Sequence, residues 1–244
     1  SGIYLYQHCY YTSIDSNIIT GNANDGIRMY QYNNYTSIDS NTITGNDDNG
    51  IELNYHNNSS TIQNNVISSN QGEYGIGFEN YNDHVTIENN TITDNDSYGI
   101  YFDYSNSHLT IQGNTVAEHT SSGIYFSSQN NGDIISNLVY DNGEYGLYLS
   151  QMSGGDCQVR NNTIDGHTGY GLYWNSNDAY WYTLEALNNS ITNNETGIHC
   201  ENGYENNTVA YNNCWNNSSS NYSGSGLPTG TGNLTDINSN GIVS

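Results

Sequence analysis

The sequence predicts an all-β protein, a single-stranded right-handed parallel β-helix of about nine coils, each with about 24 residues and three short strands. Three observations support this prediction: a glycine followed by Ile or Leu recurs every 23 to 26 residues, apolar residues alternate with polar ones after it, and asparagines return at fixed places. Self-similarity at such a period is typical of solenoids. The recurring glycines are Gly2, Gly26, Gly50, Gly75, Gly99, Gly123, Gly146, Gly171 and Gly197.

The first strand of each coil follows the glycine. Apolar side chains alternate with other residues there, as in Ile3 and Leu5, or Ile51 and Leu53. Strict alternation over a few residues indicates a strand with one buried face.

Two further strands complete each coil. One carries a central Ile, such as Ile38, and the next begins with an Asn and continues to an apolar residue, as in Asn41 and Ile43. Strands this short leave no room for helical crossovers, so successive coils must stack and pair their backbones.

The recurring asparagines indicate ladders at the corners of the coils. Asn tolerates the left-handed backbone conformation, and its amide can bond to the same amide one coil away. A second polar corner holds Asn22, Asn46, Asn70, Asn95, His119, Asn142, His167, Asn194 and Asn212. We expect the β-helix to span 1–215 and a polar tail or terminal coil to span 216–244.

The charge balance excludes several partners. The chain has two arginines, no lysine and 25 Asp and Glu residues, which gives a net charge of -23. Nucleic acid needs cationic side chains, so it is an unexpected partner. No apolar run is long enough for a membrane span. No cofactor is required, although such an acidic surface can bind Ca²⁺.

The pattern of Asn89-Asn90-Thr91-Ile92 leading to Gly99-Ile100 resembles the NosD-like and pectate-lyase-like superfamily of right-handed β-helices. The resemblance runs from Gly2 to about Trp215 and implies the fold. It leaves the chemistry open, since that superfamily includes lyases, hydrolases, epimerases, adhesins and spacers. Enzymes of the superfamily usually place their site on the face of the strand after each glycine.

On that face, Glu79 and Asp103 fall in one column of adjacent coils, roughly 5 Å apart, with Glu52 one coil further and on the neighbouring column. These three residues are weak candidates for a catalytic acid and nucleophile, and Glu79 and Asp103 for Ca²⁺ binding. The alternative is a solvated acidic face. A pectate lyase site is not assembled, because Arg28 is the only cation of the face. A polygalacturonase site is not assembled either, because Asp47-Asp48 lies in a turn between Asn46 and Gly50.

An aromatic column follows the same face, at Tyr101, Tyr125, Tyr148 and Tyr173. Such a strip is a candidate carbohydrate-binding surface, because tyrosine rings stack on sugars or proteins. The alternative is that the rings only stack on each other.

Other candidates lie at the corners and the C-terminal end. Asp236, Asn238 and Asn240 resemble the opening of a calcium loop, with a polar turn as the alternative. Cys200 and Cys214 are expected to form a disulfide. His84 and His108 occupy equivalent corner positions one coil apart, where we expect them to stack as corner groups rather than bind a metal.

The sequence favours an extracellular or cell-surface structural protein, a building block of a surface layer, sheath, adhesin or filament that self-associates through its coil ends. Near-uniform coils, few trypsin sites and a chain that begins inside a coil at Gly2 motivate this hypothesis, and sequons such as Asn34 admit glycosylation. The alternative is an extracellular polysaccharide-binding or polysaccharide-degrading module. An enzyme is less expected, and it would be a polysaccharide lyase or a glycoside hydrolase.

Overall fold

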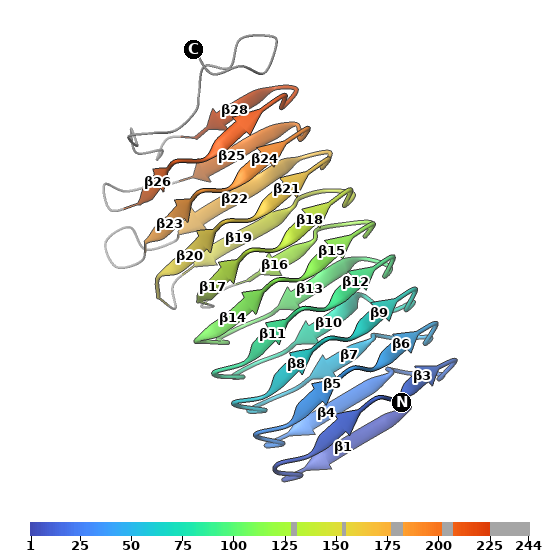
Figure 1. Cartoon of the computed structure of the whole chain (residues 1–244). Helices are drawn as coiled ribbons and strands as arrows, with labels where there is room; N and C mark the ends of the chain where they lie inside the picture. Colours follow the sequence, from blue (N-terminus) through green and yellow to red (C-terminus); the bar gives the residue numbers. More distant parts are fainter. Residues whose placement is uncertain (128–130, 153–154, 177–182, 202–206, 225–244) are drawn as a thin grey trace.

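The computed structural model of the chain describes residues 1–127, 131–152, 155–176, 183–201 and 207–224. In these residues the chain winds through three strands per coil, and the coils stack along one axis from β1 to β28 (Figure 1). The predicted right-handed parallel β-helix is confirmed. Helices long and apolar enough to cross a membrane do not occur in the described part.

Sheet A contains the strand that follows each recurring glycine. Its ten strands are parallel and lie in the order of the chain. They are β1 (Ile3–Gln7), β4 (Ile27–Gln31), β7 (Ile51–Leu53), β10 (Tyr74–Phe78), β13 (Tyr98–Phe102), β16 (Ile124–Phe126), β19 (Leu147–Met152), β22 (Tyr170–Ser176), β25 (Thr196–Glu201) and β28 (Ser220–Ser223). The last strand lies in the segment predicted as a polar tail or terminal coil, and residues 225–244 lie outside the described ranges.

Sheets B and C contain the two shorter strands of each coil, and each has nine parallel strands. Sheet B consists of β2 (Ser13–Asp15), β5 (Ser37–Asp39), β8 (Thr61–Gln63), β11 (Thr86–Glu88), β14 (Leu109–Gln112), β17 (Gly132–Ile135), β20 (Cys157–Arg160), β23 (Leu184–Leu187) and β26 (Thr208–Ala210). Sheet C consists of β3 (Ile18–Thr20), β6 (Thr42–Thr44), β9 (Val66–Ser68), β12 (Thr91–Thr93), β15 (Thr115–Ala117), β18 (Leu138–Tyr140), β21 (Thr163–Asp165), β24 (Ser190–Thr192) and β27 (Asn213–Trp215).

The interior is a set of apolar columns, because equivalent residues pair across coils. Ile27 pairs with Ile51 in sheet A, and Ile38 pairs with Ile62 in sheet B. Large rings enter only part of the sheet A column, where Phe78 stacks on Phe102 with ring centroids 4.5 Å apart.

The recurring glycines are required by a close approach between sheets A and C. A Cβ atom on Gly50 would lie 2.5 Å from Ile67 Cγ2 and 2.5 Å from the Gly75 carbonyl oxygen. Any side chain at this position would therefore force the coil open.

Both predicted asparagine ladders are present, but Asn212 was assigned to the wrong one: it pairs with Asn189, and Asn217 follows Asn194 at the second corner. The Asn41 amide donates to Asn65 Oδ1 at 3.0 Å, and the Asn65 backbone N–H donates to Asn90 Oδ1 at 2.9 Å. A third ladder, at the corner between sheets A and B, was not predicted. It consists of Asn33, Asn57, Asn82 and Asn106.

The backbone explanation for the corner asparagines needs correction. The left-handed residues are those that precede the ladder asparagines, such as Ser40 with φ of 56° and Asn64 with φ of 55°. The ladder residues that follow, Asn41 and Asn65, contribute through their side-chain amides, because one amide can donate to one neighbouring coil and accept from the other.

Two histidines replace asparagine in the ladder between sheets C and A. The Asn95 N–H donates to His119 Nδ1 at 3.2 Å, and His119 Nε2 lies 3.1 Å from the Ile92 carbonyl oxygen. His167 Nδ1 accepts from Asn142 N–H at 3.2 Å. The His119 ring copies both functions of an amide only while Nδ1 is unprotonated, and His167 Nδ1 accepts its hydrogen bond under the same condition.

Replacing Asn65 by Ala should lower the free energy of unfolding by about 3 kcal/mol, because buried donors and acceptors in both neighbouring coils lose their partners. Urea denaturation would measure the change. Asn24→Ala is the matched control, since Asn24 is exposed. Equal stability of the two variants would contradict a structural role for the ladder.

Burial lowers the pKa of His167 to about 4. This folded-state pKa lies below the unfolded value of 6.5. The contribution of His167 to stability is therefore fully present above pH 6.5 and is lost as the pH falls towards 4. His167→Asn should therefore remove acid sensitivity of as much as about 3 kcal/mol. Urea titrations at pH 7.5 and 4.5 would measure it, with exposed His8→Asn as control, and an unchanged pH dependence would count against the neutral ladder histidine.

Candidate functional site

The outward face of sheet A carries a continuous column of stacked rings, named here the tyrosine stack. Tyr101, Tyr125, Tyr148 and Tyr173 follow one another with centroid distances of 5.0, 5.0 and 4.5 Å and interplanar angles of at most 10°. The sequence therefore predicted correctly that these four side chains form one column.

The stack is longer than predicted because a ring from another position fills a gap. Gly77 has no side chain, and the ring of Tyr74 lies over it, where a Cβ on Gly77 would be 2.4 Å from Tyr74 Cδ2. Tyr74 stacks on Tyr101 with centroids 4.5 Å apart. At the other end His199 stacks on Tyr173 at 5.5 Å.

Parallel rings at these separations cover one another's faces. A sugar stacks on a free aromatic face, whereas this column presents ring edges and hydroxyl groups to solvent. Burial, together with neighbouring Tyr148, raises the pKa of Tyr125 to about 12, so the hydroxyl is neutral at physiological pH. Tyr173 is 7% exposed and donates its hydroxyl to Glu201 Oε2 at 2.7 Å.

Glu79 and Asp103 lie in one column, as predicted. Each follows a sheet A strand, and their backbone N–H groups donate to Leu53 and Phe78 carbonyl oxygens at 2.9 Å. Burial raises the pKa of Asp103, and the charge of Glu79 raises it further. Two carboxyl groups at equivalent positions of adjacent coils could share a cation or a proton.

Glu52 occupies a separate polar cluster on β4 and β7. Arg28 Nη1 lies 3.6 Å from Glu52 Oε2 and 3.7 Å from Asp25 Oδ2, and Asn54 Nδ2 donates to Glu52 Oε1 at 2.8 Å. Glu52 is 8% exposed and Asp25 is fully buried. Burial is the largest cause that raises the pKa of Glu52; Asn54 and Arg28 oppose it and Asp25 adds to it, and the net pKa is about 7.

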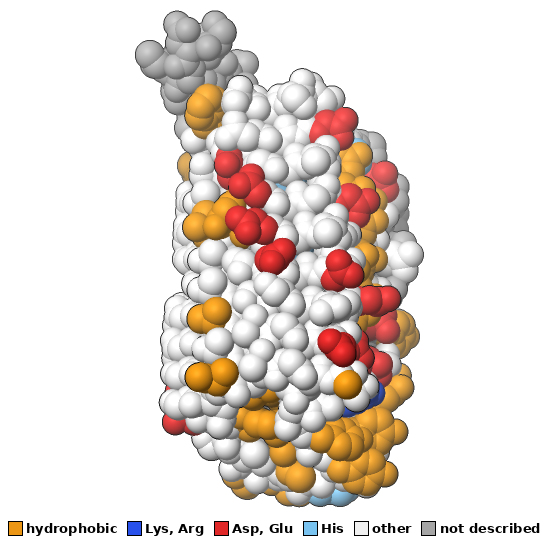
Figure 2. Space-filling model, turned by 90° about the vertical axis from the view of Figure 1, so that its right-hand side faces the viewer, with side chains coloured by type: hydrophobic (Ala, Val, Ile, Leu, Met, Phe, Trp, Pro, Cys, Tyr) orange, Lys and Arg blue, Asp and Glu red, His pale blue; other side chains and the backbone are white. Residues whose placement is uncertain are grey.

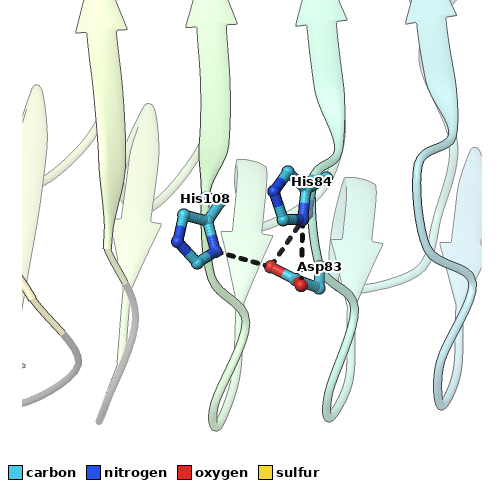
Figure 3. A group of neighbouring side chains, drawn as sticks. All are labelled: Asp83, His84 and His108. Atoms are coloured by element: carbon cyan, nitrogen blue, oxygen red, sulfur yellow. Dashed lines mark hydrogen bonds and ion pairs between the residues drawn. The ribbon is translucent and has the colours of Figure 1, made fainter.

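A second cluster lies at the corner between sheets A and B. His84 and His108 stack with centroids 4.5 Å apart and an interplanar angle of 12°, which confirms the predicted stacking. Sequence reasoning missed Asp83, whose carboxylate lies beside the stacked rings and contacts Nδ1 of each histidine (Figure 3). The available signal was the Asp-His pair followed by a histidine 24 residues later.

Acidic side chains also line the corner where sheet C turns into sheet A. Figure 2 shows them along this face, with hydrophobic side chains gathered near the N-terminal end. A shallow depression of about 320 Å³ is lined there by Asp94, Asp96 and Glu118, among others. Its open, polar walls favour hydrated ions over an organic ligand.

Two predictions concern the C-terminal region. The calcium-loop candidates Asp236, Asn238 and Asn240 lie outside the described residues. Cys200 and Cys214 are free thiols, so the expected disulfide is absent from this structure. Cys200 lies on β25 of sheet A and Cys214 on β27 of sheet C, and the Cys214 thiol forms a hydrogen bond with Tyr222.

The chain matches the protein family described as "Right handed beta helix region" over residues 1–117 and 32–185. It belongs to the right-handed β-helix family. No curated protein sequence matches the chain significantly.

Solved β-helix structures resemble the whole stack. The Dettilon tailspike protein superposes with a TM-score of 0.62 and 20% identity over 84% of this chain, which spans 46% of the tailspike chain. The A-module of the Azotobacter vinelandii mannuronan C-5 epimerase AlgE4 gives a TM-score of 0.53 and 13% identity, over 93% of this chain and 81% of that module. At these identities the likeness demonstrates the fold.

The pKa of Glu52 predicts how the stability of this β-helix protein depends on pH. The folded pKa of about 7 exceeds the unfolded value of 4.5, so stability falls as the pH rises from 4.5 to 7. Glu52→Gln should abolish this loss, which amounts to at most about 3 kcal/mol. Urea unfolding between pH 4.5 and 8 would test it; exposed Glu118→Gln should retain the wild-type slope, and a Glu52→Gln variant with the same slope would refute the assignment.

Proposed function

We propose that the chain is a non-enzymatic structural protein of the cell exterior, a rigid β-helical building block of a surface layer, sheath, adhesin or filament. The observation that carries this proposal is the covering of the aromatic faces in the tyrosine stack. The most conspicuous surface feature of sheet A thereby serves contact between coils.

Contacts between equivalent residues of successive coils also occur in the other columns. Core residues, ladder amides and outward rings all bond or pack with their equivalents in the next coil. An additional coil from a second molecule would meet the same register, which supports self-association through coil ends. A fold likeness to a tailspike protein supports a role outside the cell.

The composition suits an exposed and durable position. Two Lys and Arg residues leave few sites for trypsin-like proteases, and the net charge of -23 favours solubility. The Asn-x-Ser/Thr sequons add acceptor sites for glycans if the chain is secreted.

The second candidate function is a polysaccharide-binding or polysaccharide-degrading module. The position of Glu79 and Asp103 in one column of adjacent coils favours it, because two neighbouring carboxyl groups can bind Ca²⁺ or hold a proton for a sugar. The fold likeness to an epimerase module that acts on mannuronan supports the same alternative. The hydroxyl edge of the tyrosine stack would then supply hydrogen bonds rather than stacking faces.

Negative-stain electron microscopy tests the structural proposal. The purified protein should form fibres or sheets, and their abundance should change with ionic strength because the subunits are strongly acidic. Dispersed monomers at every salt and Ca²⁺ concentration would contradict assembly.

A glycan array with matched variants separates the two functions. The structural proposal expects no glycan binding or turnover above background. Binding that is lost in Glu79→Gln and Tyr125→Ala but retained in Tyr140→Ala, whose side chain lies on sheet C, would instead establish the polysaccharide module.

A further inference from the structure

The corner between sheets A and B brings two imidazoles and one carboxylate together. His84 Nδ1 lies 2.9 Å from Asp83 Oδ2, and His108 Nδ1 lies 2.8 Å from Asp83 Oδ1 (Figure 3). The potential ligand atoms of the three residues all lie within 4.8 Å of one another. Two consecutive coils therefore contribute to a single cluster.

The backbone of both coils fixes this arrangement. Asp83 pairs with Ser107 in an isolated parallel bridge, and the His84 N–H donates to the Ser107 carbonyl oxygen at 3.0 Å. The His108 N–H donates to Asn131 Oδ1 at 2.9 Å. The Cα positions are held in this way, while the side chains of His84 and His108 remain 62% and 64% exposed and can rotate towards a ligand.

Neighbouring coils show that backbone pairing at this corner does not require an Asp at the position of Asp83. Asn34 and Asn58 occupy the position of Asp83, and each accepts the backbone N–H of the next coil through Oδ1. Asp83 instead directs its carboxylate at two imidazoles and at the Ser107 hydroxyl, which donates at 2.7 Å. The Asp83 carboxylate therefore contacts both imidazoles, which the amides at this position in the preceding coils do not.

We infer that Asp83, His84 and His108 bind one divalent transition-metal ion, Zn²⁺ or Cu²⁺, through Nδ1 of each histidine and a carboxylate oxygen. Imidazole is a preferred ligand of these ions, whereas Ca²⁺ and Mg²⁺ select oxygen. Bonds of about 2.0–2.2 Å place tetrahedral ligands about 3.3 Å apart, so the present separations need only small side-chain rotations. Exposure leaves the remaining coordination positions to water.

Binding would join two coils across 25 residues of chain. An ion that binds only the folded protein raises its stability in proportion to the logarithm of ion concentration. The midpoint of thermal unfolding should therefore rise with Zn²⁺, and the same rise should be absent from variants without the cluster.

Isothermal titration of the intact chain with Zn²⁺, in millimolar Ca²⁺ to occupy unspecific carboxylates, tests the site. Useful variants are His84→Asn and His108→Asn, because Asn tolerates the left-handed backbone at φ of 55° and 51°. Asp83→Asn introduces the residue of the preceding coils. His56→Asn is the matched control, since His56 has φ of 59° and stacks on Tyr32 and Tyr81.

The expected result is one Zn²⁺ per chain, with affinity reduced at least about tenfold in each cluster variant and unchanged in His56→Asn. Electron paramagnetic resonance of the Cu²⁺ form should show two coordinating nitrogens in the wild type. Absent binding, or binding that survives all three cluster substitutions, would overturn the inference, as would a Cu²⁺ spectrum without nitrogen ligands.

Discussion

Hydrogen bonding between equivalent residues of successive coils is the interaction on which the rest of this structure depends. Parallel pairing fixes the rise per coil at about 4.8 Å. That distance lies close to the separation at which aromatic rings stack and within reach of side-chain amides. Once backbone pairing sets the repeat, rings, amides and imidazoles stack without a separate adjustment of their spacing, as the 4.5 Å between Phe78 and Phe102 illustrates.

The same repeat controls the ionisable groups. A side chain in a column is covered by neighbours above and below, so burial is the main cause of the raised pKa of Glu52 and of the lowered pKa of His167. The consequences differ in sign, because one group is charged when deprotonated and the other when protonated. Stability is therefore limited from both sides of neutrality, by Glu52 on sheet A and by His167 at a corner.

Much of the fold could be predicted, because the repeat length and the alternation of apolar and polar residues are enough to show which residues stack on one another in successive coils. Gly50 marks the start of a coil for steric reasons, and Asn65 follows at a constant offset from Ile62. The third ladder escaped prediction because Asn57 and its equivalents lie between strands, without an adjacent apolar residue to mark their position.

The candidate site was less predictable because columns do not specify side-chain orientation. The shared column of Glu79 and Asp103 followed from offset alone. Mutual stacking of the tyrosine rings was one of two sequence-based alternatives, whereas the position of Tyr74 over Gly77 and the contact of Arg28 with Glu52 depend on rotamers and on contacts between different columns.

The amide ladders give the coil stack a direction. In the chain of contacts from Asn17 through Asn41 and Asn65, each Nδ2 donates towards the following coil and each Oδ1 accepts from the preceding one. Any cut across the stack thus leaves amide donors on one surface and carbonyl acceptors on the other. Two such surfaces match only head to tail, so a fibre built by continuing the ladders would be polar, with chemically distinct growing ends.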